Sequence, residues 1–302
     1  MPRSTDANLL VGIENSDDAG VFRLSEHQAL VQTIDFFTPI VDDPYDYGRI
    51  AAANSLSDVY AMGGMPVTVL NVCCFDPDSA PPEVWAAIIT GMRDKTLESG
   101  AVIAGGHTVV NAQPLFGLSV TGVIDPARIF RNDQAEVGDG IYLSKPLGIG
   151  IVTTAIKFDK CSSEEARSAT ESMATLNAQA AGRAHEANVK CATDVTGFSL
   201  AGHLYNCARA SGVGVEVDSQ SLPVLPGVER MVGDGAITGG GSKNRSYLGD
   251  SLAFDESVPR WLREVVLDPQ TSGGLATFSK VPVVGAVKIG RVVSGQAKIK
   301  VK

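Results

Sequence analysis

Four aspartates stand among small, apolar or glycine neighbours, where an unpaired charge would be costly. They are Asp18, Asp35, Asp58 and Asp194. An ionised carboxylate in a partly dry site needs an opposite charge or a metal ion as its partner. Magnesium suits this role, because it takes few protein carboxylates and fills its octahedron with water and phosphate oxygens. The four aspartates therefore predict a Mg²⁺ site for a phosphate-bearing ligand.

Each aspartate also has an ordinary structural interpretation. Asp17 and Asp18 could form a turn. Asp58 could be an exposed charge on a helix, and Asp194 could cap a helix. Only the joint occurrence of these carboxylates with glycine-containing segments favours the metal site over these alternatives.

The segment AGGHT follows a short strand expected at 101–104 and carries a histidine and a hydroxyl after two glycines. Its glycines would let backbone N–H groups approach an anion, which predicts an exposed phosphate-binding bend. A tight strand turn with a hydrogen-bonded histidine fits the segment equally well. The remaining histidines are interpreted as surface or helix residues without a role: His27, His185 and His203.

Several classes of protein are disfavoured by the sequence. The net charge of -9 would repel a nucleic acid backbone, so nucleic acid is an unexpected partner. No apolar run reaches the roughly 18 residues of a membrane helix, which predicts a cytosolic protein without a membrane partner. The five cysteines are odd in number and have no C-x-x-C spacing, which indicates neither a disulfide framework nor a zinc site.

Neither familiar nucleotide loop is present. The sequence KPLGIGIVTT has two glycines after an expected strand but lacks the third glycine of a dinucleotide site. No G-x-x-x-x-G-K-[ST] segment occurs, so ATP would have to bind on another scaffold. DPQTSGG, at 268–274, could be structural or could line a pocket, and the segment 238–244 is predicted to be a flexible loop.

The elements of the first half must position the first three aspartates. A strand is predicted at 29–34, with Asp35 near its exit. The run YDYGRIAAANSLSDVYAMGG predicts a helix that Gly63 and Gly64 end, with Asn54 and Asp58 on one face because they are four residues apart. A strand at 67–74, a helix that begins near Pro81 and a strand at 115–124 complete this half.

The second half begins after a polar, loop-like segment between about residues 125 and 140, where we place the domain boundary. We expect domains at 1–125 and 126–302, which agrees with the length of 302 residues. An alanine-rich helix is predicted near 164–188, then a strand at 189–192 and a helix from about Ser199. Strands and helices alternate in both halves, which predicts two α+β or α/β domains.

The motifs together resemble one family when they are taken in order. They are NLLVGIENSDDAGVF, TIDFFTPIVDDPYDYGRIAAANSLSDVYAMGG, AGGHT, KPLGIGIVTTA, TDVTGFSLAGHL, LPGV and DPQTSGGL. This series closely resembles the selenophosphate synthetases, of the aminoimidazole ribonucleotide synthetase superfamily, from about Asn8 to Leu275. An ordered series is more specific than any single motif.

The resemblance implies a homodimer in which each N-terminal α+β domain builds a β-barrel with its mate, followed by a C-terminal α+β domain. It implies conversion of ATP, selenide and water to selenophosphate, AMP and orthophosphate, with Mg²⁺, and admits a selenium-delivery protein as a further partner. The family's metal-site aspartates correspond to Asp18, Asp35, Asp58 and Asp194. Its ATP-contact positions correspond to Asn15, Ser16, Asp17, Asp35, Asp58, Gly106, His107 and Thr108, the last three reaching ATP from the partner subunit.

The sequence departs from the family in two places. Family members carry a reactive Cys or selenocysteine and a catalytic Lys upstream of the segment that matches NLLVG, whereas the seven residues before Asn8 contain neither. We therefore expect this chain to make little or no selenophosphate as it stands, and we assign no catalytic residue. The family also has more chain, including a helix, between the positions of Leu275 and Val284.

Two other functions remain open at this point. A related enzyme of the superfamily, such as thiamine-monophosphate kinase or a purine-pathway synthetase, would share the fold and the aspartates. A catalytically silent paralogue would bind nucleotide without turnover. TDVTGF, DPQTSGG and FFTPIVDDP favour the selenium enzyme, and release of AMP rather than ADP would distinguish it.

Overall fold

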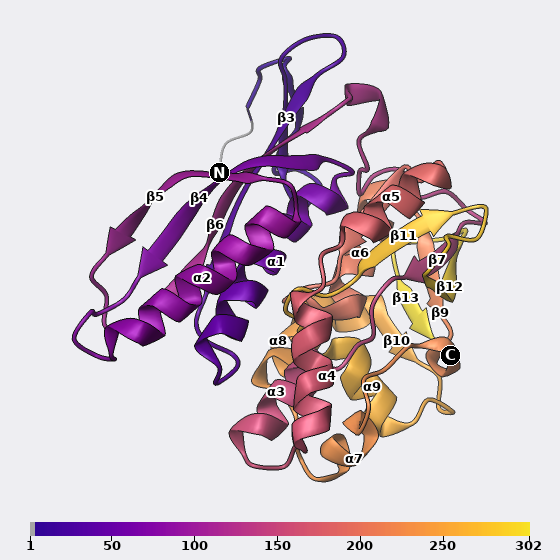
Figure 1. Ribbon diagram of the computed structural model, residues 1–302. Helices are drawn as coiled ribbons and strands as arrows, with labels where there is room; N and C mark the ends of the chain where they lie inside the picture. Colours follow the sequence, from indigo (N-terminus) through magenta and orange to yellow (C-terminus); the bar gives the residue numbers. More distant parts are fainter. Residues whose placement is uncertain (1–3) are drawn as a thin grey trace.

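Two mixed β-sheets, one in each half of the chain, organise the molecule (Figure 1). The computed structural model describes residues 4–302. The N-terminal sheet has six strands in the order β1-β2-β3-β6-β4-β5, and the C-terminal sheet has seven in the order β10-β13-β9-β12-β7-β11-β8. This is the two-domain α+β architecture that the alternation of strands and helices predicted. Both edge strands of the N-terminal sheet, β1 and β5, are unpaired on their outer sides within the described residues, 4–302.

The centre of the N-terminal sheet is antiparallel. β3 pairs with β6, and β6 pairs with β4, whereas β5 is parallel to β4. β3 is longer than predicted, so Asp35 lies inside the strand opposite Leu118 rather than at its exit. The strands are β1 (Leu9–Val11), β2 (Gly20–Arg23), β3 (Ala29–Phe37), β4 (Met65–Cys74), β5 (Val102–Val109) and β6 (Leu115–Ile124).

Two long helices, α1 (Pro44–Ala61) and α2 (Pro82–Glu98), pack against each other along one side of this sheet (Figure 1). Both helices were predicted and are confirmed. They approach closely at two glycines: a Cβ on Gly48 would lie 2.0 Å from the carbonyl oxygen of Ile88, and one on Gly91 would lie 2.1 Å from that of Tyr45. Real Cβ atoms do not come this close, so both crossing points require glycine.

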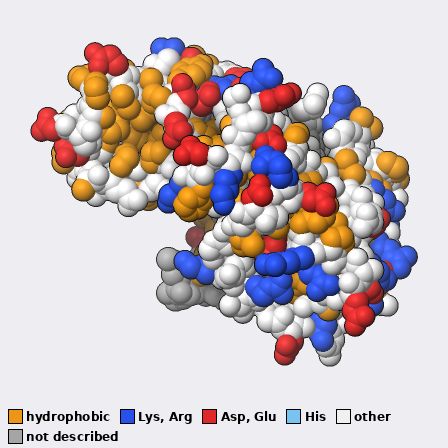
Figure 2. Space-filling view, turned by 90° about the horizontal axis from the view of Figure 1, so that it is seen from below, with side chains coloured by type: hydrophobic (Ala, Val, Ile, Leu, Met, Phe, Trp, Pro, Cys, Tyr) orange, Lys and Arg blue, Asp and Glu red, His pale blue; other side chains and the backbone are white. Residues whose placement is uncertain are grey.

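Apolar side chains also lie on the opposite, uncovered face of the N-terminal sheet. Ile34, Ser119 and Leu70 occupy one row across β3, β6 and β4, and both apolar members are exposed. Figure 2 shows hydrophobic side chains gathered on the N-terminal domain. Every residue of the edge strand β5 is exposed as well. Such a patch on a sheet with an open edge marks an interaction surface.

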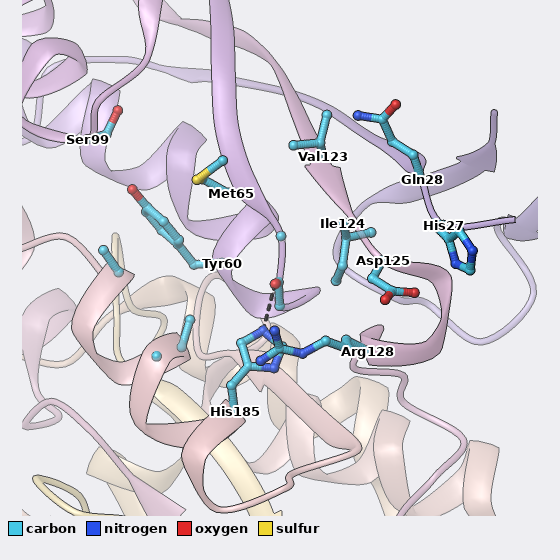
Figure 3. Close-up of a pocket in the computed structure, with 15 residues that line it drawn as sticks. His27, Gln28, Tyr60, Met65, Ser99, Val123, Ile124, Asp125, Arg128 and His185 are labelled. Atoms are coloured by element: carbon cyan, nitrogen blue, oxygen red, sulfur yellow. Dashed lines mark hydrogen bonds between the residues drawn. The ribbon is translucent and has the colours of Figure 1, made fainter. Parts of the chain in front are cut away.

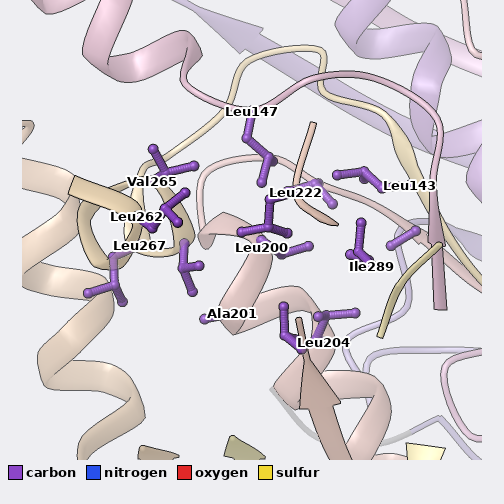
Figure 4. Packing of buried hydrophobic residues seen from close by; sticks show 14 of the residues in the cluster. Leu143, Leu147, Leu200, Ala201, Leu204, Leu222, Leu262, Val265, Leu267 and Ile289 are labelled. Atoms are coloured by element: carbon purple, nitrogen blue, oxygen red, sulfur yellow. The ribbon is translucent and has the colours of Figure 1, made fainter. Parts of the chain in front are cut away.

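The C-terminal domain packs helices around the seven-stranded sheet, and its core includes Leu143, Leu200, Leu204, Leu262 and Ile289 (Figure 4). Its strands are β7 (Gly140–Leu143), β8 (Cys191–Asp194), β9 (Gly214–Val217), β10 (Leu252–Phe254), β11 (Leu275–Ser279), β12 (Val287–Val293) and β13 (Ile299–Val301). Its helices are α3 (Ile149–Lys157), α4 (Ser163–Ala174), α5 (Ala178–Glu186), α6 (Ser199–Ser211), α7 (Val228–Gly233), α8 (Gly239–Leu248) and α9 (Arg260–Leu267). Short 3₁₀ turns occur at η1 (Pro126–Arg128), η2 (Ser219–Ser221) and η3 (Gly249–Ser251).

The segment DPQTSGG caps helix α3, which begins in KPLGIGIVTT. Gln270 Oε1 accepts hydrogen bonds from the backbone N–H groups of Gly148 and Ile149, both at 3.0 Å. Asp268 Oδ2 accepts one from Ile151 at 3.2 Å. These contacts satisfy N–H groups that a helix start leaves without partners. The two motifs therefore have a shared structural role at this helix.

Three predicted elements of the chain are wrong in detail. The single helix at 164–188 is two helices, α4 and α5, with a break at 175–177. The strand at 189–192 is β8, which reaches Asp194. The predicted loop at 238–244 is largely the start of α8, capped by Thr238, whose side chain accepts from Gly241 N at 3.2 Å.

Within residues 4–302, no helix combines the length and apolar character needed to cross a membrane.

Candidate functional site: a carboxylate cluster between the domains

Three of the four predicted aspartates come together where the two domains meet. Asp18 lies in the loop between β1 and β2, Asp58 on α1, and Asp194 at the end of β8. Burial raises the pKa of Asp18 well above its usual range, and the charges of Asp194 and Asp58 raise it further. Burial, followed by the charge of Asp194, likewise raises the pKa of Asp58. These three carboxylates therefore repel one another in a poorly hydrated place, which is unfavourable without a cation.

Two carboxylate oxygens of this cluster are available to a ligand. Asp18 Oδ2 and Asp194 Oδ1 are buried and have no hydrogen-bond partner within residues 4–302. Across the same residues, no three His, Cys, Asp or Glu side chains already surround one point as a ready metal cage. Magnesium does not need such a cage, because one or two carboxylates, water and substrate phosphates complete its shell. The donor set therefore fits a Mg²⁺ ion that is shared with a phosphate ligand.

Helix α1 carries the polar face that holds the cluster. Asn54, Ser57 and Asp58 are three and four residues apart, so they lie on one side of the helix. Asn54 donates a hydrogen bond to Asp35 Oδ2, which brings the fourth aspartate to the edge of the site. Burial raises the pKa of Asp35, while the bond from Asn54 lowers it. Ser57 Oγ donates to Asp194 Oδ2 at 2.5 Å.

The same face of α1 is tied to the C-terminal domain. Asn177 Nδ2 donates to Ser57 Oγ and to the carbonyl oxygen of Gly273, both at 2.8 Å. Asn54 Oδ1 accepts from the backbone N–H of Ser272 at 2.7 Å. Since these groups are buried, losing any one of them would leave an unsatisfied polar atom. The hydrogen bonds thus fix α1, and its aspartate, against the DPQTSGG segment.

A histidine that the sequence analysis left without a role supports Asp18. His203 lies on helix α6, in agreement with its interpretation as a surface or helix residue, but it is buried and takes part in hydrogen bonds. Its Nε2 accepts from the backbone N–H of Thr196 at 3.1 Å, so its proton is on Nδ1, which lies 3.2 Å from Thr193 Oγ1. Thr193 Oγ1 in turn donates to Asp18 Oδ1 at 2.9 Å. The motif TDVTGFSLAGHL thus supplies both a site carboxylate and the residues that orient another.

This histidine should make the protein sensitive to acid. Burial lowers the pKa of His203 to about 4, from 6.5. Between these values the unfolded chain binds a proton that the folded chain excludes, so stability falls as pH falls from 6.5 to 4. We expect His203→Gln to remove about 2 to 3 kcal/mol of the difference in unfolding free energy between pH 7 and pH 4.5. Urea unfolding at both pH values measures this, with the exposed His27→Gln as control. Equal pH dependence in wild type and His203→Gln would contradict it.

The predicted ATP-contact segment at 15–17 lies against the linker between the domains. Asp17 Oδ1 accepts from Asn132 N, and the carbonyl oxygen of Ser16 accepts from Asn132 Nδ2, both at 2.8 Å. Asn15 Nδ2 donates to Asp133 Oδ2 at 3.2 Å. Ser16 has a φ of 56°, which bends the loop. The segment is therefore held beside Asp18 by the C-terminal half of the chain.

Gly106, His107 and Thr108 are not brought to the cluster within this chain. They lie in the middle of strand β5 rather than in the predicted bend. β5 is three strand positions from β3, which corresponds to roughly 14 Å. A Cβ on Gly106 would lie 2.4 Å from the carbonyl oxygen of Asn71, so this glycine allows the close pairing of β5 with β4. The predicted bend is therefore wrong, whereas contact of this segment with a phosphate stays a prediction.

A buried lysine near the cluster was also missed by the sequence analysis. Lys145, in KPLGIG, donates from Nζ to the carbonyl oxygens of Thr175 at 2.6 Å and Ser272 at 2.8 Å. Burial lowers the pKa of Lys145 to about 7, although the nearby charge of Asp194 raises it. The glycines of this motif are conspicuous in the sequence, whereas burial of a lysine has no periodic signal.

A cavity of about 570 Å³ lies at the domain junction, away from the carboxylate cluster (Figure 3). Tyr60, Arg128 and His185 line it, and His185 Nε2 lies 2.8 Å from the carbonyl oxygen of Gly63. None of the predicted site residues lines this cavity. We therefore place the candidate site at the carboxylate cluster and not in this cavity.

Comparisons with known proteins agree with the two-domain fold. Residues 16–124 match the family model "AIR synthase related protein, N-terminal domain", and residues 136–302 match "AIR synthase related protein, C-terminal domain". A solved structure of AaThiL complexed with AMPPCP and TMP has a TM-score of 0.71 at 18% identity, covering 94% of this chain and 87% of that one. The fold and these matches define a two-domain protein related to AIR synthase.

Two relatives show to which family within this group the chain belongs. Selenide, water dikinase of Caldanaerobacter subterraneus subsp. tengcongensis is 47% identical over 268 residues, covering 89% of this chain and 77% of the relative. Selenide, water dikinase 2 of Peptoclostridium acidaminophilum is 40% identical over 311 aligned residues, covering 99% of this chain and 89% of the relative. The chain belongs to the selenide, water dikinase family.

Proposed function

We propose that the reaction of this protein is the synthesis of selenophosphate from ATP, selenide and water, with release of AMP and orthophosphate, and that Mg²⁺ bound at the carboxylate cluster takes part. The low turnover expected for this chain from its sequence stays a prediction. The relatives named selenide, water dikinase carry this proposal, since two of them are 47% and 40% identical over most of the chain. The buried carboxylate oxygens of Asp18 and Asp194 support the metal, because they have no protein partner within residues 4–302.

The aspartates would divide two tasks in this reaction, holding the metal and contacting the nucleotide. Magnesium, when bound, would neutralise phosphate charge, which is most of what phosphoryl transfer requires of an enzyme. Asp18, Asp58 and Asp194 would hold it, and Asp35 would contact the metal or the nucleotide. Asn15, Ser16 and Asp17 would lie along the nucleotide, beside Asp18. Ser57, Asn177 and His203 would keep these carboxylates in place through the hydrogen bonds described above.

The direct test is a product analysis. The protein is incubated with ATP, Mg²⁺ and selenide under anaerobic conditions, and ³¹P NMR follows the phosphorus compounds. Selenophosphate, AMP and orthophosphate in equal amounts are expected from the active enzyme. Formation of ADP in place of AMP would contradict the proposal. ATP binding that does not depend on Mg²⁺ would contradict the assignment of the carboxylates.

We further propose that two copies of the chain associate through the uncovered face of the N-terminal sheet and close a β-barrel between them. Ile34 and Leu70, in the row across β3, β6 and β4, are 58% and 46% exposed. Exposure of these apolar side chains to water is unfavourable in a single chain. The unpaired edge of β5 offers backbone groups to a second copy. Such a dimer would also bring Gly106, His107 and Thr108 of each copy toward the nucleotide of the other.

A charge in the centre of this face should separate the copies. We expect Leu70→Asp to convert a dimer to a monomer in sedimentation equilibrium, because the carboxylate would be buried without a partner at the interface. Val137→Asp, at another exposed apolar position in the C-terminal half, is the control and should leave the dimer intact. A monomeric wild-type protein would show that this face has another role.

A further inference from the structure

A smaller cavity lies in the C-terminal domain where α5 faces β11. Its volume is about 270 Å³, and its wall includes the connection between β11 and β12. Among its described lining residues are the amine of Lys145 and the guanidinium of Arg183, and none is Asp or Glu. The chain as a whole has a net charge of -9. A guanidinium and an amine in a lining without carboxylates predict an anionic ligand for this cavity, and an anion would in turn favour the protonated form of Lys145.

The two cations still have hydrogen-bonding capacity. Lys145 Nζ donates to two carbonyl oxygens, so when it is protonated its third N–H has no partner within residues 4–302. Arg183 Nη1 donates to Glu186 Oε2 at 2.9 Å, and its other N–H groups have no partner in the described chain. Its side chain is 41% exposed, so it can reorient toward a ligand. An ammonium and a guanidinium suit the oxygens of a small anion.

The start of helix α5 adds backbone donors to the same wall. Gln179 and Ala180, in the first turn, line the cavity. The residue before the helix, Asn177, makes no side-chain hydrogen bond to this turn. Its amide donates instead to Ser57 and Gly273. The first N–H groups of α5 therefore lack the usual cap, and a helix start of this kind favours a negative ligand.

We propose that this cavity binds a small tetrahedral oxyanion of the phosphate class, held by Lys145, Arg183 and the first turn of α5. The volume of about 270 Å³ lies below the roughly 300 to 1,000 Å³ of pockets for drug-sized ligands, which favours a few-atom anion over a nucleotide. The hydrogen-bonded chain from Asn177 through Ser57 to Asp194 connects this site to the carboxylate cluster. The proposal goes beyond the reaction proposed above and does not depend on it.

The experiment is a titration of the full chain with inorganic phosphate, followed by ³¹P NMR in EDTA. Without a divalent cation the carboxylate cluster repels phosphate, so it does not contribute to the signal. We expect saturable binding, weakened about tenfold in Arg183→Met. Arg167→Met is the matched control, because Arg167 is also an exposed arginine on a helix of this domain and does not line the cavity. It should bind like wild type.

Lys145→Met should weaken phosphate binding further, but it also leaves two buried carbonyl groups without their donor. The comparison of Arg183→Met with Arg167→Met therefore decides whether the cavity binds phosphate. Absence of saturable binding, or equal affinity in wild type and Arg183→Met, would overturn the proposal. A parallel titration with AMP separates the two sources of a phosphate group. Tighter, Arg183-dependent binding of AMP would replace the oxyanion with a nucleotide. Since no ATP, magnesium or selenide is present, failure here leaves the proposed reaction untouched.

Discussion

Asp58→Asn should reduce Mg²⁺-dependent ATP turnover on the order of 100-fold, and it should also stabilise the metal-free protein. The loss of activity follows from removing one charge that would hold the metal against the phosphates. The gain in stability follows because burial and the charge of Asp194 both penalise an ionised Asp58. Asparagine keeps an oxygen that can accept the hydrogen bond from Thr33.

The two effects have opposite signs, which separates a site residue from a structural one. A gain of about 1 kcal/mol in a chain of this size corresponds to a rise in melting temperature of about 2 to 4 °C. Calorimetry in EDTA measures the rise, and a coupled assay for AMP measures turnover. Asp78→Asn, on an exposed loop, is the control for removal of one negative charge. If Asp58→Asn were less stable than wild type without metal, the cluster would not be the strained site described here.

Gly91→Ala should destabilise the N-terminal domain by about 3 kcal/mol or more, through one added methyl group. The new Cβ would lie 2.1 Å from the carbonyl oxygen of Tyr45 and 2.9 Å from the backbone nitrogen of Arg49. Backbone atoms cannot move aside by changing rotamer, so α1 and α2 must separate. Because α1 carries Asn54, Ser57 and Asp58, this movement should also weaken Mg²⁺–ATP binding. Chemical unfolding and isothermal titration calorimetry measure the two effects.

Gly182→Ala provides the matched comparison. Gly182 is a helical glycine on α5, and a Cβ there would meet nothing within 4 Å. Alanine has the higher helix propensity, so this variant should gain up to about 1 kcal/mol. A Gly91→Ala protein as stable as wild type would mean that the two helices are not in backbone contact at this glycine.

The long helices of the N-terminal domain could be predicted because their signals are local. Apolar residues recur with helical spacing in α1 and α2, and proline and glycine mark their ends. The break between α4 and α5 has no such signal, since no glycine or proline interrupts residues 164–181. There the chain is held by Asn177, whose amide binds Ser57 and Gly273, both remote in sequence. Tertiary contacts overrode an alanine-rich helical pattern.

The glycines of AGGHT gave a clear signal in the sequence that was interpreted wrongly. They were interpreted as a bend around an anion, but Gly106 is required by the close pairing of β5 with β4. Sequence alone does not separate these two uses of glycine, because both need an approach that a side chain would block. Only the neighbouring strand reveals which use applies.

At the site, residue type identified the carboxylates but not their supports. An aspartate among apolar neighbours is conspicuous in a sequence, because charge is seldom buried without a reason. Ser57, Asn177 and His203 are ordinary residues whose importance comes from burial and from the hydrogen bonds that they make. Lys145 was overlooked for the same reason. Such residues can be found only after the fold has placed them.

The carboxylate cluster draws its members from both halves of the chain, and this division has a thermodynamic consequence. Asp18 and Asp58 belong to the first domain and Asp194 to the second, so a cation that binds all three binds only the docked arrangement. Ligand binding and domain docking are then linked equilibria, and each favours the other. A bound ion would therefore couple the unfolding of the two domains, so that they unfold in one cooperative transition.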